Sequence, residues 1–479
     1  MATRAGSSRT PFLSSAKGEE RWSGPGAPVT AALAFAASLA AGMLAAAFAW
    51  IPLLGMAGAA VLAWFAVTTT YLALSALLIV RSVADYFAEV PIVLELNAGA
   101  ILGIAVVIIA GMRLLRTPQP RGLIAAAAFV LAFLFWFILG LGEYGAHPSL
   151  LRELVRSLAL VAVALIALNH GGTLSPSRLG TLVVLGSLIP ASVAVVEGVA
   201  NWHELATDDY RARGSLAHAN SAGLLFAIAI LFAAWKWTSD RAGRRYLVAL
   251  LLFTVALLFT KSMGGLGQAV IGLMVFGMLQ GSRWNRWAIL AVVVGFVVFF
   301  FTDPLGITRS EELATTNVRA TEEAEHTNTL DWRLVNAAYF LRSWQEAPVL
   351  GHGFGTTVEL IWPFGYEPHS DYLRALVETG IVGTVLLLAG FAWLLNALVV
   401  RWRYAPAGEA SFYPAMLALF VGLAAHAFVT HATFETAPMF LIAVLIGGTL
   451  SFQPVERPAL IAPWRRLRPH RSSGRPAAP

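Results

Sequence analysis

Long apolar segments recur along nearly the whole chain, and this pattern constrains the fold more than any other feature. A helix needs about 20 mainly apolar residues to cross the hydrocarbon core of a membrane. The 479 residues are 58% hydrophobic and only 13% charged, whereas soluble domains carry roughly 25% charged residues. This composition excludes an ordinary water-soluble enzyme and predicts an all-α, polytopic transmembrane helix bundle. Beyond residue 80, the candidate spans cover roughly residues 97–112, 121–142, 152–168, 179–200, 219–237, 246–262, 264–281, 287–302, 376–400, 412–432 and 436–452.

Basic residues orient these predicted spans, because Lys and Arg concentrate in cytoplasmic loops. Alternate loops from Arg113 onward are basic, and so is the segment after Phe452. The net charge of +6 therefore indicates membrane topology rather than a nucleic-acid partner, and we expect none. The predicted cytoplasmic positions are Arg113, Arg116, Arg121, Lys236, Arg241, Arg244, Arg245, Arg283, Arg286, Arg401 and Arg403.

The apolar run from Val29 to Val80 leaves the number of spans open. A cytoplasmic N-terminal tail requires an odd number of crossings there, yet 52 residues extend about 78 Å as a helix, which suits two. We therefore predict 12 to 14 spans. The expected organisation is a disordered cytoplasmic tail over 1–28, a transmembrane bundle over 29–302, a periplasmic loop subdomain with short helices over 303–374, C-terminal transmembrane helices over 375–452 and a basic cytoplasmic tail over 453–479.

The long outer loop carries the residues best suited to chemistry. Gly351, Gly353 and Gly355 alternate along it, which permits a tight backbone path. His369 then follows at the start of the helix that enters the next span. A histidine at this position can serve as a general base near neutral pH. Capping or anchoring the helix at the interface is the alternative role for the same side chain.

Two blocks in this region, DWRLVNAAYFLRSWQEAPVLGHGFGT and PHSDYLRALVETGIVG, resemble the signature of the O-antigen ligase and Wzy polymerase superfamily. Upstream, YRARGSLAHANSAG resembles a further family segment, and the whole resemblance covers residues 210–450. The family's arginine after a span is replaced by Met263, with Lys261 as the candidate substitute, and Ser370 stands where many members have Asn. The matching positions are Arg211, Gly214, Ser215, Asn220, Arg333, Trp344, Pro348, Gly351, Gly353, Gly355, His369, Tyr372, Leu373, Glu378, Gly380, Ile381 and Gly383.

The resemblance implies a multi-pass glycosyltransferase of the bacterial inner membrane. Such an enzyme transfers a glycan from undecaprenyl diphosphate to an acceptor sugar hydroxyl on the periplasmic side, inverting the anomeric centre without a metal or cofactor. Its acceptor is lipid A-core for a ligase or a lipid-linked repeat unit for a polymerase, and the shared signature does not separate these two activities. The short C-terminal tail disfavours a third family activity, glycosylation of pilin-type proteins.

The implied roles fall on named side chains, because guanidinium groups bind phosphate bidentately and an imidazole accepts the acceptor's proton. We expect His369 to be catalytic. Arg309, Arg342 and Arg374 are expected to be solvated rim charges. The expected diphosphate ligands are Arg211, Arg213, Arg333, Arg319 and Lys261, and the loop-shaping or acceptor-side residues are Gly351, Gly353, Gly355, Tyr372 and His431.

Two other classes remain as alternatives. A flippase or transporter of lipid-linked oligosaccharides often shows inverted repeats, and no matching halves are evident here. A metal-dependent transferase would place Asp85, Glu89 or Glu95 at its centre. The sequence has no H-E-x-x-H motif and no D-x-D motif at a membrane edge, so we predict no metal.

Overall fold

The structure is a computed structural model. It describes residues 69–87, 91–93, 96–117, 120–170, 172–207, 210–239, 243–280, 283–302, 329–358 and 368–452. The predicted tails 1–28 and 453–479, most of the apolar run Val29–Val80, and Arg319 lie outside these residues. The number of crossings before residue 69 therefore stays a prediction.

The described chain is almost entirely helical, which confirms the predicted all-α class. Its only strands form a short antiparallel ladder of β1 (Pro91–Val93) and β2 (Leu96–Asn97). Short helical elements are η1 (Asp85–Phe87), α8 (Trp202–Thr207) and η2 (Ala432–Phe434), and α14 (Thr329–Glu346) is a longer helix within the predicted periplasmic loop. The long helices are α3 (Thr70–Ala84), α4 (Ala98–Arg116), α5 (Leu123–Tyr144), α6 (Pro148–Leu168), α7 (Pro176–Ala200), α9 (Ala219–Ser239), α10 (Gly243–Phe259), α11 (Met263–Leu279), α12 (Arg283–Thr302), α15 (Asp371–Tyr404), α16 (Phe412–Val429) and α17 (Thr436–Ser451).

Every predicted span from 97–112 to 436–452 coincides with one of these long helices. Among the described residues, seven helices are long and apolar enough to cross a membrane, and α11, α17 and part of α12 are shorter apolar helices. These findings confirm a polytopic helix bundle, and the chain is a multi-pass membrane protein.

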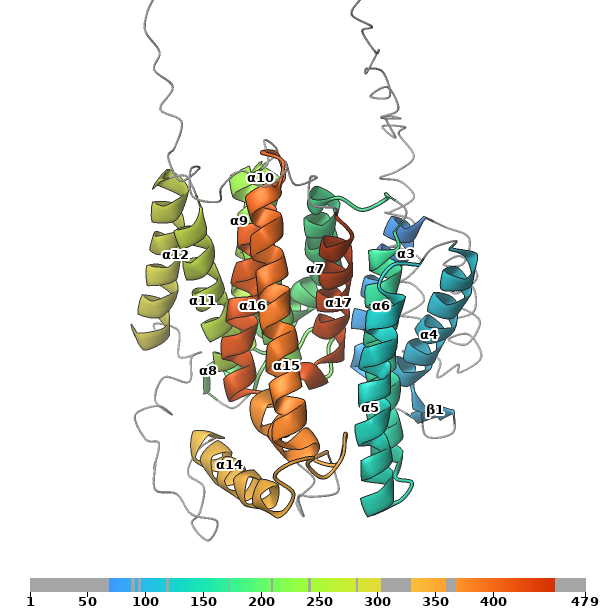
Figure 1. Cartoon of the computed structure of the whole chain (residues 1–479). Coiled ribbons are helices and arrows are strands. Elements are labelled where there is room, and N and C mark those ends of the chain that lie inside the picture. The colour runs from blue at the N-terminus through green and yellow to red at the C-terminus, as the bar shows by residue number, and fades with distance from the viewer. Residues whose placement is uncertain are drawn as a thin grey trace, which may run out of the picture. The chain divides into compact units, whose positions relative to one another are not determined.

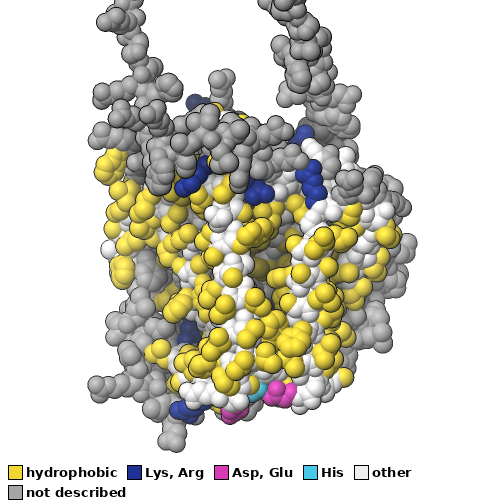
Figure 2. All heavy atoms as spheres, in the orientation of Figure 1, with side chains coloured by type: hydrophobic (Ala, Val, Ile, Leu, Met, Phe, Trp, Pro, Cys, Tyr) yellow, Lys and Arg dark blue, Asp and Glu magenta, His cyan; other side chains and the backbone are white. Residues whose placement is uncertain are grey.

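The long helices run between two ends of the bundle, and successive ones alternate in direction (Figure 1). We call the end that carries Arg121, Arg244 and Arg401 the basic end. The opposite end, which carries α8, α14 and the start of α15, is called the site end (Figure 1). Figure 2 shows hydrophobic side chains over the middle of the visible face and Lys and Arg side chains gathered toward the basic end.

α9 lies in the middle of the bundle, in contact with α7, α10 and α11. Every residue from Ser221 to Lys236 is buried. A helix that is apolar on all sides is suited to such a position. α9 therefore places Asn220 and Ser221, in its first turn, at the site end of the bundle (Figure 1).

The two motif blocks interlock where α15 is broken. Gly380 has φ 62° and ψ −167°, which interrupts the helix. The preceding loop docks into this break: the N–H groups of His352 and Gly353 donate to the carbonyls of Val377 and Glu378 at 3.0 and 2.9 Å. Gly351 (φ 71°) and Gly353 (φ 101°) also have left-handed backbones, which glycine adopts without strain. The interlock fixes the loop that leads to His369 against α15.

Candidate functional site

His369 lies immediately before the N-cap residue of α15. Ser370 is that cap, and its hydroxyl accepts from the N–H of Leu373 at 3.5 Å. The N–H of His369 donates to the Asn336 side chain on α14 at 3.4 Å. Arg333 is one turn before Asn336 on α14, so both lie on the same helix face. The structure thus brings the predicted Arg333 and His369 together at the site end.

His431 faces His369 from the loop between α16 and α17. The two ring centroids are 4.8 Å apart and the rings are tilted by 34°. Burial, together with the positive charges of Arg374, His218, Arg333 and Arg156, lowers the pKa of His431 to about 3. His431 is therefore a neutral imidazole at neutral pH.

Glu435 continues this group toward α9. Its carboxylate lies 3.9 Å from Nε2 of His431 and accepts a hydrogen bond from the Ser221 hydroxyl. The sequence did not single out Ser221, which follows the motif residue Asn220 directly. The contacts from His369 through His431 and Glu435 join α15 to the first turn of α9.

The guanidinium of Arg211 is hydrogen-bonded to protein groups near the start of α9. Its Nε donates to the carbonyl of Thr260 at 2.9 Å and its Nη2 donates to Asn220 Oδ1 at 2.6 Å. Ser262, after α10, also donates to Asn220 at 3.4 Å. Lys261 lies in this same turn with φ 49°. Arg211 and Lys261 thus belong to the junction of α9, α10 and α11.

Arg213 and Tyr372 each contact other parts of the protein. Arg213 is exposed, and its guanidinium lies over the Tyr86 ring at 5.4 Å. The Tyr372 hydroxyl donates to the carbonyl of Ala424 on α16 at 3.0 Å. Tyr372 therefore connects the first turn of α15, which follows His369, to α16.

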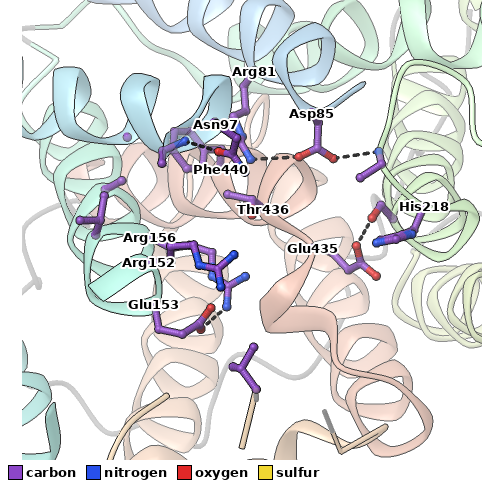
Figure 3. A pocket seen from close by; sticks show the side chains of 18 of the residues that line it. Arg81, Asp85, Asn97, Arg152, Glu153, Arg156, His218, Glu435, Thr436 and Phe440 are labelled. Atoms are coloured by element: carbon purple, nitrogen blue, oxygen red, sulfur yellow. Dashed lines mark hydrogen bonds and ion pairs between the residues drawn. The ribbon is translucent and has the colours of Figure 1, made fainter. Parts of the chain in front are cut away.

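A cavity of about 270 Å³ opens next to His431, between α3, α4, α6 and the first turns of α9 and α17. Three arginines that were not predicted from the sequence line it. Figure 3 shows Arg81 with Asp85, Arg152 with Arg156, and Glu435 with His218 around this space. The other polar lining residues are Asn97, Ser149, Glu153, Ser221, His431 and Thr436.

Arg81 is the most informative of these cavity residues. It is only 4% exposed, and its Nη2 donates to Asp85 at 3.0 Å. Its Nε and Nη1 have no hydrogen-bond partner within the part of the chain that the structure describes. A side chain at Gly99 would overlap with Nη1, so this glycine makes room for the guanidinium. Buried donors without acceptors are costly, which favours an anion as the cavity's ligand.

Arg374 corrects one expectation. We expected a solvated rim charge, but Arg374 is 5% exposed and pairs with Glu153 at 2.7 Å and with Glu378 at 3.0 Å. The two carboxylates compensate its charge, and one of them comes from α6, far away in the sequence. Arg342, by contrast, is exposed as expected.

His352 ties the glycine-rich loop to its neighbours. Its Nδ1 lies 2.8 Å from Glu143 at the end of α5, and its Nε2 lies 2.9 Å from the carbonyl of Ser343 on α14. The ring is buried. His352 therefore contacts two helices that flank the loop.

The signals for the cavity arginines are present in the sequence. An ionisable residue within an apolar span is costly and suggests a functional site. Arg81 occurs at the end of an apolar run, and Arg152 and Arg156 are spaced i, i+4, which places them on one face of α6.

Asp85, the candidate of the metal-dependent alternative, is paired with protein donors. Its carboxylate accepts from Arg81 at 3.0 Å and from the N–H of Ala217 at 3.3 Å. Glu89 and Glu95 lie outside the described residues. In the described ranges no group of three or more His, Asp or Glu side chains could hold a metal ion.

Residues 247–388 match a family model described as O-antigen ligase. The match confirms the predicted resemblance to the O-antigen ligase and Wzy superfamily, and it includes Lys261, Arg333, His369 and Glu378. It supports a membrane protein that transfers glycans as a ligase or polymerase does. No curated protein matches the chain.

Proposed function

We propose that this protein is a glycosyltransferase of the bacterial inner membrane that takes a glycan from undecaprenyl diphosphate and joins it to a sugar hydroxyl of a lipid-anchored acceptor on the periplasmic side. The observation that carries the proposal is Arg81, whose buried nitrogens lack partners among the described residues in a cavity shared with Arg152 and Arg156.

The cavity provides the donor side of the reaction. The diphosphate of the lipid carrier lies at the boundary between membrane and water, which is where the site ends of α3 and α6 lie in this topology. Arg81, Arg152 and Arg156 bind its oxygens and stabilise the charge that develops as it leaves. Preorganised charge of this kind is usually the largest contribution to catalysis. Arg333 adds positive charge close to His431.

His369 provides the acceptor side. It lies against the face of His431, whose ring also lines the cavity. The acceptor hydroxyl attacks the anomeric carbon from the side opposite the diphosphate, and His369 accepts its proton. A bond forms from the acceptor oxygen to carbon while the bond from carbon to the diphosphate oxygen breaks, so the configuration inverts. The guanidinium groups supply the charge stabilisation, and the mechanism uses no metal.

The direct test is transfer by the purified protein from an undecaprenyl diphosphate glycan, with lipid A-core and without it, in the presence of EDTA. Product only with lipid A-core identifies a ligase, and a ladder of products from the donor alone identifies a polymerase. Absence of transfer under both conditions, or a strict requirement for a metal, contradicts the proposal.

A further inference from the structure

A buried network of ion pairs joins α15 to α6 behind the cavity, and Arg374 is at its centre. Arg374 lies five residues after His369. The motif residue Glu378 belongs to the same network, although the proposed chemistry gives it no task. The inference below rests on the proposed function, because it concerns how the donor site is held.

The orientation of Arg374 is determined by three elements. Its Nε donates to Glu378 at 3.0 Å, one turn further along α15, and its Nη1 lies 3.5 Å from the Thr433 hydroxyl of η2. Glu378 is 1% exposed and also accepts from the hydroxyl and the N–H of Thr357 in the glycine-rich loop. Glu378 is therefore an anchor that directs the remaining end of Arg374 toward α6.

The Nη2 group of Arg374 contacts a residue that lines the cavity. Nη2 of Arg374 donates to Oε2 of Glu153 at 2.7 Å, and the same oxygen accepts from Nη2 of Arg156. Glu153 and Arg156 line the cavity, whereas Arg374 does not. One carboxylate oxygen is thus shared between a guanidinium inside the cavity and one behind it.

The sharing of Glu153 determines how much of the positive charge of Arg156 remains for an anion in the cavity. A carboxylate paired with a single arginine is frequently held by two hydrogen bonds and offsets the charge of that arginine. Glu153 instead divides its negative charge between Arg374 and Arg156, so it offsets the charge of Arg156 only in part. The other charged groups facing the cavity are Arg81 with its partner Asp85, Arg152, His218 and Glu435.

We propose that Arg374, anchored by Glu378, is a positioning residue that shares the carboxylate of Glu153 with Arg156 and so keeps part of the positive charge of Arg156 available to the donor diphosphate. Arg374 touches neither substrate. Because it also lies in the first turns of the helix that follows His369, the network links the base to the donor site.

The test uses the full-length protein and measures the KM for the donor and kcat separately. Removing Arg374 alone would leave buried carboxylates uncompensated, so the variant is the charge-balanced pair Arg374→Gln/Glu378→Gln. Glu153 then pairs fully with Arg156, and we expect the KM for the donor to rise about tenfold with kcat within about threefold. Adding Glu153→Gln releases Arg156, and the KM should return to within about threefold of the wild-type value.

The restoration by a third substitution separates positioning from a purely structural role. If the triple variant binds donor no better than the double, the proposal is wrong. Arg244→Gln, the same chemical change at an exposed arginine of the basic end, is the matched control and should leave both constants unchanged. If the double variant does not accumulate in the membrane, Arg374→Lys with and without Glu153→Gln gives the same comparison, because an ammonium retains the charge but lacks the fork.

Failure of the proposal for Arg374 can be distinguished from failure of the proposed function. If Arg81→Lys and Arg156→Gln leave the KM for the donor unchanged, the cavity is not the donor site and both proposals fall. If those variants raise the KM while the triple variant shows no restoration, only the role of Arg374 is refuted.

Discussion

Arg81 and Arg211 show two uses of a guanidinium at the same end of the bundle. Arg211, which matches the family motif, donates to Thr260 and Asn220 and joins three helices. Arg81, outside the motif, has two buried nitrogens without an acceptor among the described residues. At the scale of single residues, we therefore propose Arg81, and not Arg211, as a ligand of the donor diphosphate, because the contacts of Arg81 leave donors for an anion.

Arg81→Lys tests this distinction. Lysine keeps the positive charge beside Asp85 but cannot offer a planar fork to phosphate. We expect the KM for the donor to rise about tenfold, with unchanged protein abundance in the membrane. The matched control is Arg244→Lys at the basic end, and equal KM values for the two variants would contradict the assignment.

His369 is expected to determine the pH dependence of transfer. A general base works only when deprotonated, so the rate should increase with pH through the ordinary imidazole range, around pH 6.5. His431 does not titrate there, since its pKa lies at about 3. His369→Ala should abolish transfer while donor binding persists. A flat pH–rate profile, or a His369→Ala protein with full transfer activity, would exclude His369 as the base.

His431 should also affect stability in acid. Burial lowers its pKa from the ordinary imidazole value of about 6.5 to about 3, so below pH 6.5 the unfolded chain binds a proton that the folded protein does not. Stability is therefore lost as the pH falls from about 6.5 toward 3, at up to about 1.4 kcal/mol per pH unit. His431→Asn removes this contribution, and its Tm should fall less steeply between pH 7 and 4 than that of the wild type. Parallel Tm curves would contradict the assignment.

At the scale of elements, the break in α15 explains why the family motif contains glycines on both sides of His369. The Pro348 carbonyl accepts from the N–H of Ile381 at 3.0 Å, and the N–H of Phe354 donates to Trp136 of α5 at 2.9 Å. The glycine-rich loop is thus a clamp between α5 and the two halves of α15. The glycines shape the support of the site, and Glu378 within the break reaches toward the cavity through Arg374.

Gly380→Ala tests the clamp. A Cβ at this position would overlap with the carbonyl oxygen of Val349, and the backbone conformation of φ 62° and ψ −167° alone costs about 1–3 kcal/mol for alanine. We expect a lower Tm and less protein in the membrane. Gly390→Ala, in the open part of the same helix with no atom within 4 Å of the added Cβ, is the control and should be neutral. Equal stability of both variants would show that the break carries no strain.

At the scale of the whole molecule, the distribution of charge between the two ends of the bundle predicts its orientation. The basic end should face the cytoplasm, because positive loops are retained there, and the site end should face the periplasm. Since the chain contains no cysteine, single cysteines can report this without background.

Glu204→Cys on α8 and Arg244→Cys at the start of α10 are both exposed and lie at opposite ends. A membrane-impermeant maleimide applied to spheroplasts should label only the Glu204→Cys protein, and both after lysis. Labelling of Arg244→Cys in intact spheroplasts would reverse the topology and place the proposed site on the wrong side for a periplasmic acceptor.

The sequence by itself determined the class of protein, the positions of the spans from residue 97 onward and the block that carries Arg333 and His369. Hydrophobic length and motif spacing are local properties, so they can be read along the chain. The tertiary structure decided which charges are buried and what they contact. Arg374 and Glu153 are 221 residues apart in the sequence. Arg81 lines its cavity together with residues of α6 and α17. Only the packing of these helices determines whether an arginine is a solvated rim charge, an ion-pair partner or a ligand for an anion, because each outcome depends on burial and on carboxylates that distant segments supply.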